Sequence, residues 1–264
     1  MPTNRPLPLK DSVWGSSAVF NPMLNQHPDV WRASSPPSSL VMPSIASGHK
    51  TLDAQLPGGG WPVGHLTELL VRAMGVGELR LLAPALQRLT RANKQIIMLA
   101  PPQLPHAPAL SALGIQLNQC LVVRARRASD RLWAIEQSLR SNHFGALLAW
   151  IDEPTPHEAL RRFQLAARQA QGPVFLFRPL QAQDQPSPAP LRLALLPRQY
   201  PGLAVQLLKR RGPVAAEPVY VNLPIASRAM RPLEEAHALD RMPVPQHQSF
   251  ATSHPTGLRS TQPH

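Results

Sequence analysis

The chain has 264 residues, of which 43% are hydrophobic, and it carries a formal net charge of +12 with a pI near 11.4. This length and apolar content allow one α/β domain with extensions, and the basic charge favours anionic partners such as DNA or an acidic protein surface. A single cysteine excludes an intramolecular disulfide and a cysteine-based zinc site. The sequence shows no signal peptide and no run of about 18 apolar residues, so we expect a cytoplasmic protein without a membrane span.

The 32 prolines concentrate towards both ends of the sequence. Such composition is typical of segments that do not form a packed core. We therefore expect a Pro/Ser-rich N-terminal extension over residues 1–44, a compact domain over 45–224 and a largely disordered C-terminal tail over 225–264.

The first elements of the domain follow a clear pattern. Residues 50–56 (KTLDAQL) indicate a short amphipathic helix, and the glycine-rich residues 57–64 indicate a tight turn into a strand over 67–72. A helix is expected from Glu78 to about Ala92, with a kink or restart at Pro84.

Strands and helices alternate after that point, which favours a parallel sheet because parallel strands need crossover connections. We expect strands at 95–100, 120–124, 146–151 and 174–177, and helices at 108–113, 129–140 and 156–170. Ser129 is expected to cap its helix. Shorter strands at 191–196, 203–209 and 219–223 are expected to add antiparallel strands to the sheet.

The segment AMGVG at 73–77 lies between a strand and a helix, where nucleotide-binding proteins carry a phosphate-binding loop. Such a loop has the form G-x-x-x-x-G-K-[ST]: backbone N–H groups surround the phosphates, the Lys contacts them and the hydroxyl holds Mg²⁺. Here Gly75 and Gly77 are followed by Glu78 and Leu79, so an anion replaces the cation and an aliphatic chain replaces the hydroxyl. We expect this degenerate loop to bind no nucleotide, and we expect no other cofactor.

The residues before this loop match the RecA family in step and without a gap. That family's pattern reads roughly S-T-G-x-x-x-L-D-x-x-L-G-x-G-G-L-P-x-G-x-I-x-E-I, and the matching positions here are Ser47, Gly48, Leu52, Asp53, Leu56, Gly59, Gly60, Pro62, Gly64 and Glu68. The resemblance extends over about 30–180. It implies an α/β fold of the RecA-like, P-loop NTPase type: a mostly parallel sheet with helices on both faces.

Within that superfamily, the sequences LPGGGWP, TELL and GxGELRLL, with VWRA at 30–33, resemble the ImuA family. These are RecA-like accessory proteins of bacterial mutagenic translesion synthesis, related to the cell-division inhibitor SulA. The resemblance implies a non-catalytic adaptor in the DNA-damage (SOS) response that binds an ImuB-like polymerase-family partner, and RecA as a further candidate, to assemble the mutasome. A SulA-type division inhibitor is the first alternative, and an active DNA-dependent ATPase or recombinase is the second.

Two further positions of the RecA pattern bear on catalysis. In that family the strand equivalent to 95–100 ends in D-A-E, whose Glu activates the attacking water, whereas this chain reads APP at 100–102, and a proline cannot act as a base. The strand at 146–151 stands where the family has its metal-holding Asp. The register places Trp150 or Ile151 there, and we favour a helix-capping role for the neighbouring Asp152 over a metal-holding one. We therefore expect no enzyme.

Clusters of arginine and lysine are candidate contacts for non-specific DNA binding, although a merely solvated surface explains them equally well. They are Arg124, Arg126, Arg127, Lys209, Arg210 and Arg211. No aromatic residues interleave with them in the sequence. The histidines show no metal-binding spacing, so no metal site is expected.

The C-terminal tail contains one short apolar stripe. Met230, Leu233 and Leu239 recur near the spacing of one helical face. A segment of this kind can fold on the groove of a partner, and these residues are candidate partner contacts.

Overall fold

The computed structural model describes residues 42–152, 154–212 and 217–224. The candidate partner contacts Met230, Leu233 and Leu239 lie outside the described residues, as does nearly all of the N-terminal extension. The strands are β1 Ser44–Ile45, β2 Trp61–Pro62, β3 Leu66–Val71, β4 Ile96–Leu99, β5 Cys120–Val123, β6 Ala146–Trp150, β7 Val174–Pro179, β8 Leu191–Pro197, β9 Gly202–Lys209 and β10 Val219–Asn222. The helices are α1 Lys50–Asp53, α2 Glu78–Arg91, α3 Ala107–Ala112, α4 Ala128–Ser141 and α5 His157–Ala167, with short 3₁₀ turns at η3 Pro57–Gly59, η4 Leu117–Gln119 and η5 Leu180–Asp184.

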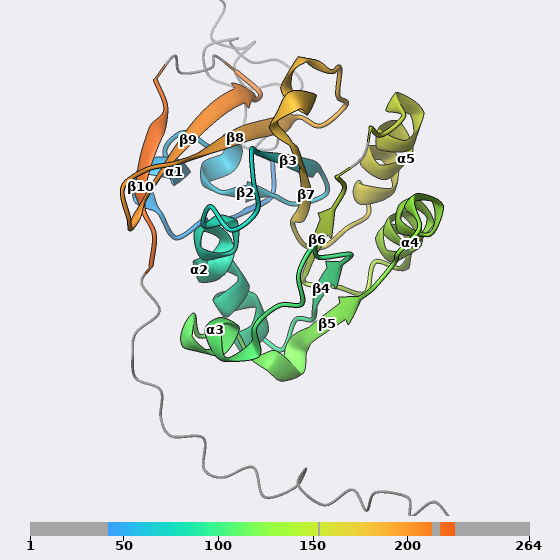
Figure 1. The fold of residues 1–264 in the computed structure, drawn as a ribbon, viewed down its shortest axis with the longest axis horizontal. Helices are drawn as coiled ribbons and strands as arrows, with labels where there is room; N and C mark the ends of the chain where they lie inside the picture. The colour runs from blue at the N-terminus through green and yellow to red at the C-terminus, as the bar shows by residue number, and fades with distance from the viewer. Residues whose placement is uncertain (1–41, 153, 213–216, 225–264) are drawn as a thin grey trace, which may run out of the picture. The chain divides into compact units, whose positions relative to one another are not determined.

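The main sheet has eight strands in the order β10-β9-β8-β3-β7-β6-β4-β5 (Figure 1). The six strands from β8 to β5 run parallel, and β9 and β10 continue the sheet antiparallel. The carboxyl ends of the parallel strands therefore meet at one end of the sheet, called here the carboxyl end, and their starts define the amino end. Strand β3, which leads into the degenerate loop, lies near the middle.

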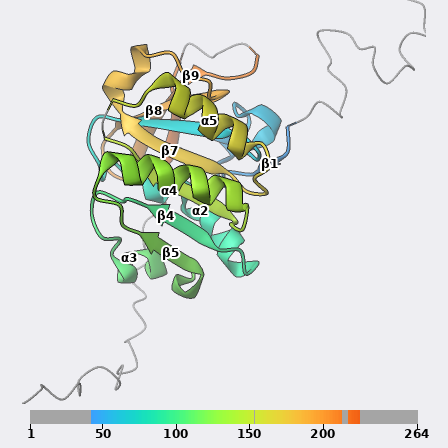
Figure 2. The same ribbon diagram turned by 90° about the vertical axis from the view of Figure 1, so that its right-hand side faces the viewer.

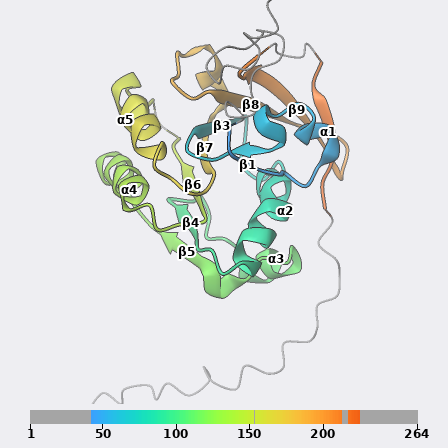
Figure 3. The same ribbon diagram turned by 180° about the vertical axis from the view of Figure 1, so that it is seen from behind.

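Helices cover both faces of this sheet, as the alternating sequence pattern predicts (Figures 2 and 3). Leu52 of α1, Leu82 and Leu86 of α2 and Leu110 of α3 pack on one face. On the other face, α4 and α5 pack through Ile135, Leu139, Leu160 and Phe163. The apolar spacing of the sequence predicts that Leu160, Phe163 and Ala167 face inward on α5, and all three are buried.

In the glycine-rich turn before β3, close backbone packing requires a glycine at position 60. A Cβ atom there would lie 2.4 Å from the carbonyl oxygen of Ile45, so only glycine lets the two backbone segments approach. This approach joins β1 to β2 in a small antiparallel sheet and buries Trp61 against Phe175, with ring centroids 5.2 Å apart.

Helix α2 does not end and restart at Pro84, so the expectation of an interrupted helix is wrong. It continues from Glu78 to Arg91 with Pro84 in its interior. The ring of Pro84 packs closely on Gly48, where a Cβ atom would come within 2.4 Å of Pro84 Cβ. Tertiary packing of this kind compensates for the single backbone hydrogen bond that a proline removes.

Of the three C-terminal strands that were expected to be antiparallel, β8 has a different direction. It pairs parallel to β3, from Thr67 opposite Leu191 to Val71 opposite Leu195, whereas an antiparallel strand was predicted. The crossover over residues 180–190 returns the chain to the amino end of the sheet before β8 begins. Strands β9 and β10 are antiparallel, as predicted.

Smaller differences occur at helix starts and ends. Helix α1 ends at Asp53, earlier than predicted, although Leu56 is buried as expected. Helix α4 begins at Ala128 with Arg127 at its N-cap position and without a side-chain cap. The hydroxyl of Ser129 instead donates to the carboxylate of Asp130, so the predicted capping role of Ser129 is wrong.

Candidate functional site

The carboxyl end of the sheet gathers the segments that follow four parallel strands. The loop after β3, residues 100–102 after β4, residues 124–126 after β5 and residues 150–152 at the end of β6 line a hollow of about 250 Å³, called here the inner hollow. In open α/β sheets, ligands bind outside the carboxyl ends of the strands. This end is therefore the candidate site.

The degenerate loop is closed by its own carboxylate. Glu78, the first residue of α2, accepts a hydrogen bond from the backbone N–H of Gly75 at 2.9 Å and another from that of Gly77 at 3.0 Å, one on each carboxylate oxygen. Its side chain is buried. These N–H groups, with the positive end of the α2 dipole, form the kind of anion-binding turn that holds phosphate in nucleotide-binding proteins. Glu78 thus supplies the anion from within the chain.

The loop is also covered by the end of the described chain. Leu223, which follows β10, packs against Gly77 so closely that a Cβ atom on Gly77 would lie 2.4 Å from Leu223 Cδ1. Arg80 of α2 fixes this segment by donating to the carbonyl oxygens of Pro224 at 2.9 Å and Leu223 at 3.3 Å. Leu79, at the position of the Mg²⁺-binding hydroxyl, packs against the hydrophobic core.

The two other positions of the RecA pattern are also without catalytic groups. Pro102 stands at the position of the water-activating Glu and lines the inner hollow together with Ala100 and Pro101. Trp150 ends β6 and stacks on Phe177 with centroids 4.6 Å apart and planes 11° from parallel. Asp152 forms an ion pair with Arg131, and Pro156 stands at the N-cap position of α5, so the predicted helix-capping role of Asp152 is wrong.

The candidate DNA contacts do not form one surface. Arg124, Arg126 and Arg127 follow β5 at the carboxyl end of the sheet, on an edge strand. Lys209 pairs with Arg192 at the start of β8, so Lys209, Arg210 and Arg211 lie at the amino end. Lys209 donates to the carbonyl oxygen of Ser187 at 2.8 Å, and Arg210 donates to Gln55.

A second hollow, of about 720 Å³, adjoins the inner one and is called here the outer hollow. The two share Arg124, Ala125 and Arg126 as a common wall. Trp133 of α4 also lines the outer hollow and is 66% exposed. Sequence analysis missed Trp133, because it follows the basic cluster in the chain instead of lying within it, and only the structure shows that it lines the same hollow.

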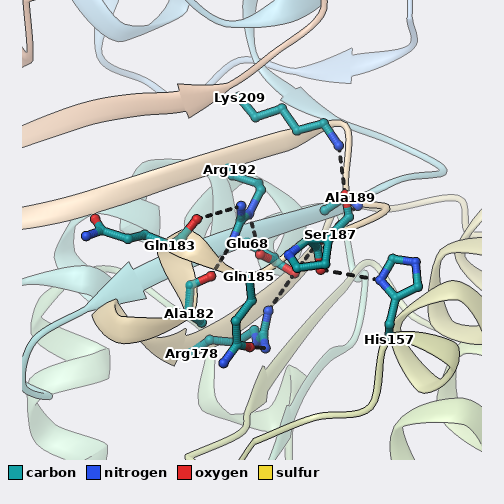
Figure 4. A network of polar contacts seen from close by, with 11 residues as sticks. Glu68, His157, Arg178, Ala182, Gln183, Gln185, Ser187, Ala189, Arg192 and Lys209 are labelled. Atoms are coloured by element: carbon teal, nitrogen blue, oxygen red, sulfur yellow. Dashed lines mark hydrogen bonds and ion pairs between the residues drawn. The ribbon is translucent and has the colours of Figure 1, made fainter.

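A buried ion network lies on β3 at Glu68 (Figure 4). Glu68 is fully buried and accepts from Arg178 of β7 at 3.2 Å, Arg192 of β8 at 2.7 Å and the hydroxyl of Ser187 at 2.6 Å. Sequence analysis noted Glu68 only as a RecA-family match. The sequence does contain a signal for this network: Arg178 and Arg192 each lie within an otherwise apolar strand. A buried charge requires a partner, so these arginines predict a buried acidic residue nearby.

This network fastens the crossover between β7 and β8. Arg192 donates to the carbonyl oxygens of Ala182 at 2.6 Å and Gln183 at 3.2 Å, and Arg178 donates to the side chain of Gln185 at 2.9 Å. The crossover contains only a 3₁₀ turn, whose backbone groups need external partners when buried. The network therefore has a structural role in holding the sheet that positions the loop.

Burial shifts the pKa of His49, His65 and Cys120. It lowers the pKa of His49 below its usual value, against raising effects of its hydrogen bond to the Leu81 carbonyl and of Asp53. It also lowers the pKa of His65, with the charges of Arg211 and Arg168 adding to the effect. Burial raises the pKa of the Cys120 thiol, which disfavours the reactive thiolate.

Across the described residues, no cluster of three or more His, Cys, Asp or Glu side chains is arranged to hold a metal ion. None of the helices in that same part of the chain is long and apolar enough to cross a lipid bilayer.

The fold and the site define an α/β protein with a large, mostly parallel sheet between helices, compatible with a RecA-like fold. Comparisons with known proteins found distant relatives among cell division inhibitors. The chain is 28% identical to the cell division inhibitor SulA of Yersinia pestis over 101 residues, which is 38% of this chain and 60% of that protein. It is 30% identical to the SulA of Edwardsiella piscicida over 81 residues, 31% of this chain and 48% of that protein.

The chain thus spans between about half and 60% of the length of these curated relatives. No family model matches the chain. The similarity to SulA is weak and is consistent with the superfamily relationship that the sequence motifs indicate.

Proposed function

We propose that this protein is a non-catalytic, RecA-like adaptor of the translesion synthesis machinery, similar to the ImuA family, which acts in the DNA-damage response by binding an ImuB-like partner. The observation that carries the proposal is the contact between Glu78 and the loop. The carboxylate takes the backbone N–H groups of Gly75 and Gly77 that a phosphate would need. A chain that retains a RecA-like sheet without an open phosphate site is suited to binding other proteins.

Electrostatics support the same proposal. Two unit charges at about 4 Å interact by about 4 kcal/mol at an effective dielectric near 20. A Lys at the position of Glu78 would attract a phosphate by an amount of this order, whereas Glu78 repels it. Displacing Glu78 would also leave a buried carboxylate without its two donors. An active DNA-dependent ATPase is therefore the weakest of the three candidate functions.

A SulA-type inhibitor of cell division is the second candidate, and the similarity to SulA proteins favours it. The matched region covers 101 of the 264 residues, and the chain resembles the RecA family from Ser47 to Glu68. These features favour the adaptor over a small inhibitor.

A bacterial two-hybrid screen against an ImuB-like protein, RecA and the tubulin-like division protein tests the proposal. We expect interaction with the ImuB-like protein, and RecA is a further candidate partner. Interaction with the division protein alone would replace the adaptor by the SulA-type function. Because the screen reads out partners, it is independent of nucleotide binding.

A further inference from the structure

We infer that the outer and inner hollows form a groove for single-stranded nucleic acid, in which Trp133 stacks on a base and Arg124, Arg126 and Arg127 contact the phosphates. The groove lies between the segment that follows β5 and the first turns of α4. This inference does not depend on the proposed partner protein.

The charge of the groove favours an anionic ligand. The two hollows together are lined by four arginines, Arg124, Arg126, Arg127 and Arg131, against two acidic residues, Asp130 and Asp152. Asp152 pairs with Arg131, and Asp130 accepts a hydrogen bond from the hydroxyl of Ser129. The groove therefore has two positive charges in excess, and Arg124, Arg126 and Arg127 are exposed.

The aromatic side chain distinguishes a single strand from a duplex. Trp133 is 66% exposed and lines the same hollow as Arg126 and Arg127. An exposed indole beside cations is the combination by which proteins bind single strands, since every base offers a face for stacking. In a duplex the bases stack on one another, so Trp133 has no free base to contact.

The inner hollow extends the groove beyond the outer one. Trp150 lines it beside Arg124 and Arg126. Its indole N–H is buried and its ring stacks on Phe177, so Trp133 is the exposed ring that the groove offers to a base.

The rest of the lining argues against an acidic peptide as the ligand. Apart from Trp133, the apolar side chains of the outer hollow are Val123, Ala125 and Ala134. A peptide is usually anchored by bulky apolar side chains that enter a pocket, and these small residues offer a shallow surface. Cations beside one flat aromatic face suit the alternation of phosphate and base better.

Fluorescence anisotropy with the full chain tests the inference. The probe is a labelled oligothymidylate longer than the roughly 4–16 nucleotides that one such site covers, compared with a labelled hairpin duplex of the same charge. Trp133→Ala should weaken binding of the single strand by about 5- to 150-fold, the effect of losing one stacked base, and should leave the duplex nearly unchanged. Trp133→Phe should restore most of the affinity, and Arg124→Ala with Arg126→Ala should weaken both probes and reduce the salt dependence.

Two controls carry similar changes elsewhere. Leu165→Ala removes another exposed apolar side chain, on α5, and Arg91→Ala removes an exposed arginine in the last turn of α2. Both should retain the affinity of the unaltered protein, and thermal unfolding should show that all variants fold. Absence of binding at low salt would overturn the inference, as would a Trp133→Ala variant with unchanged affinity or with equal losses for both probes. Binding of an acidic glutamate-rich peptide but not of the oligonucleotide would assign the groove to a protein instead.

Discussion

Leu223 lies directly against Gly77, so the residue that follows the edge strand β10 covers the loop that follows β3. A Cβ atom on Gly77 would lie 2.4 Å from Leu223 Cδ1, and Gly77 has a φ of 109°. The contact holds the loop together with the two hydrogen bonds that Glu78 accepts from it. It also makes Gly77 a position where the packing of the loop can be measured.

Gly77→Ala should destabilise the protein more than Gly75→Ala. Both glycines have positive φ, where a side chain costs about 1–2 kcal/mol. A Cβ atom at Gly77 would in addition clash with Leu223, whereas a Cβ atom at Gly75 would meet nothing within 4 Å. The difference in the free energy of unfolding, measured with urea, therefore reports the Leu223 contact. In a Leu223→Ala background the cost of Gly77→Ala should fall to that of Gly75→Ala. An unchanged cost in that background would contradict the proposed contact.

Glu68→Gln should be among the most destabilising single substitutions in the domain. It removes the carboxylate between Arg178 and Arg192, both buried, and breaking a buried ion pair costs about 3–5 kcal/mol. The matched control is Glu136→Gln, which breaks ion pairs with the exposed Arg140 and Arg162 and should cost no more than about 1 kcal/mol. Equal effects of the two substitutions on the unfolding free energy would refute the structural role given to Glu68.

Acidification should destabilise the protein through His49 and His65. Burial holds the pKa of both below the usual 6.5. The unfolded chain therefore takes up protons more readily than the folded one. The contribution of these histidines to the free energy of unfolding is full above about pH 6.5 and decreases as the pH falls towards the lowered pKa values. The decrease is at most about 1.4 kcal/mol per pH unit for each histidine.

Urea unfolding at about pH 7.5 and about pH 5.5 measures this dependence. His49→Gln with His65→Gln should reduce the difference between the two pH values, whereas His143→Gln, at an exposed position, serves as the control. A pH dependence that is the same in the double variant and in the control would show that other groups cause it.

Removal of residues 225–264 should leave the core stable and abolish binding of the ImuB-like partner. A truncation after Pro224 keeps the carbonyl groups to which Arg80 donates, so the closure of the loop is preserved. Thermal unfolding should change little, while co-purification with the partner should be lost. Leu233→Asp with Leu239→Asp in the full chain should give the same loss. Full co-purification of the truncated protein would move the binding surface to the domain.

Local sequence patterns were sufficient to predict much of this fold. The apolar run before the loop and the helical spacing of Leu160, Phe163 and Ala167 depend on neighbours in the chain, and the structure has both. The Glu78 anion was also visible in the sequence. That its two carboxylate oxygens bind the loop's own N–H groups was not, because this depends on the path of the backbone.

Long-range relationships account for what sequence analysis missed. The pattern of β8 is the same whether it runs parallel or antiparallel, and its direction depends on β3, far away in the chain. Trp133 follows the basic cluster closely in the chain and interrupts no helical pattern, so only the structure shows that it lines the same hollow as Arg126. Pro84 predicts an interrupted helix from local rules alone, whereas α2 continues through it, with Pro84 packed on Gly48.

The most direct test of the central claim is calorimetric titration of ATP with Mg²⁺ into the full chain, with and without single-stranded DNA. Because Glu78 takes the two loop N–H groups and opposes phosphate, we predict no binding in the micromolar range and no ATP turnover in either condition. Micromolar ATP binding, or turnover stimulated by single-stranded DNA, would contradict the account and identify a working nucleotide site.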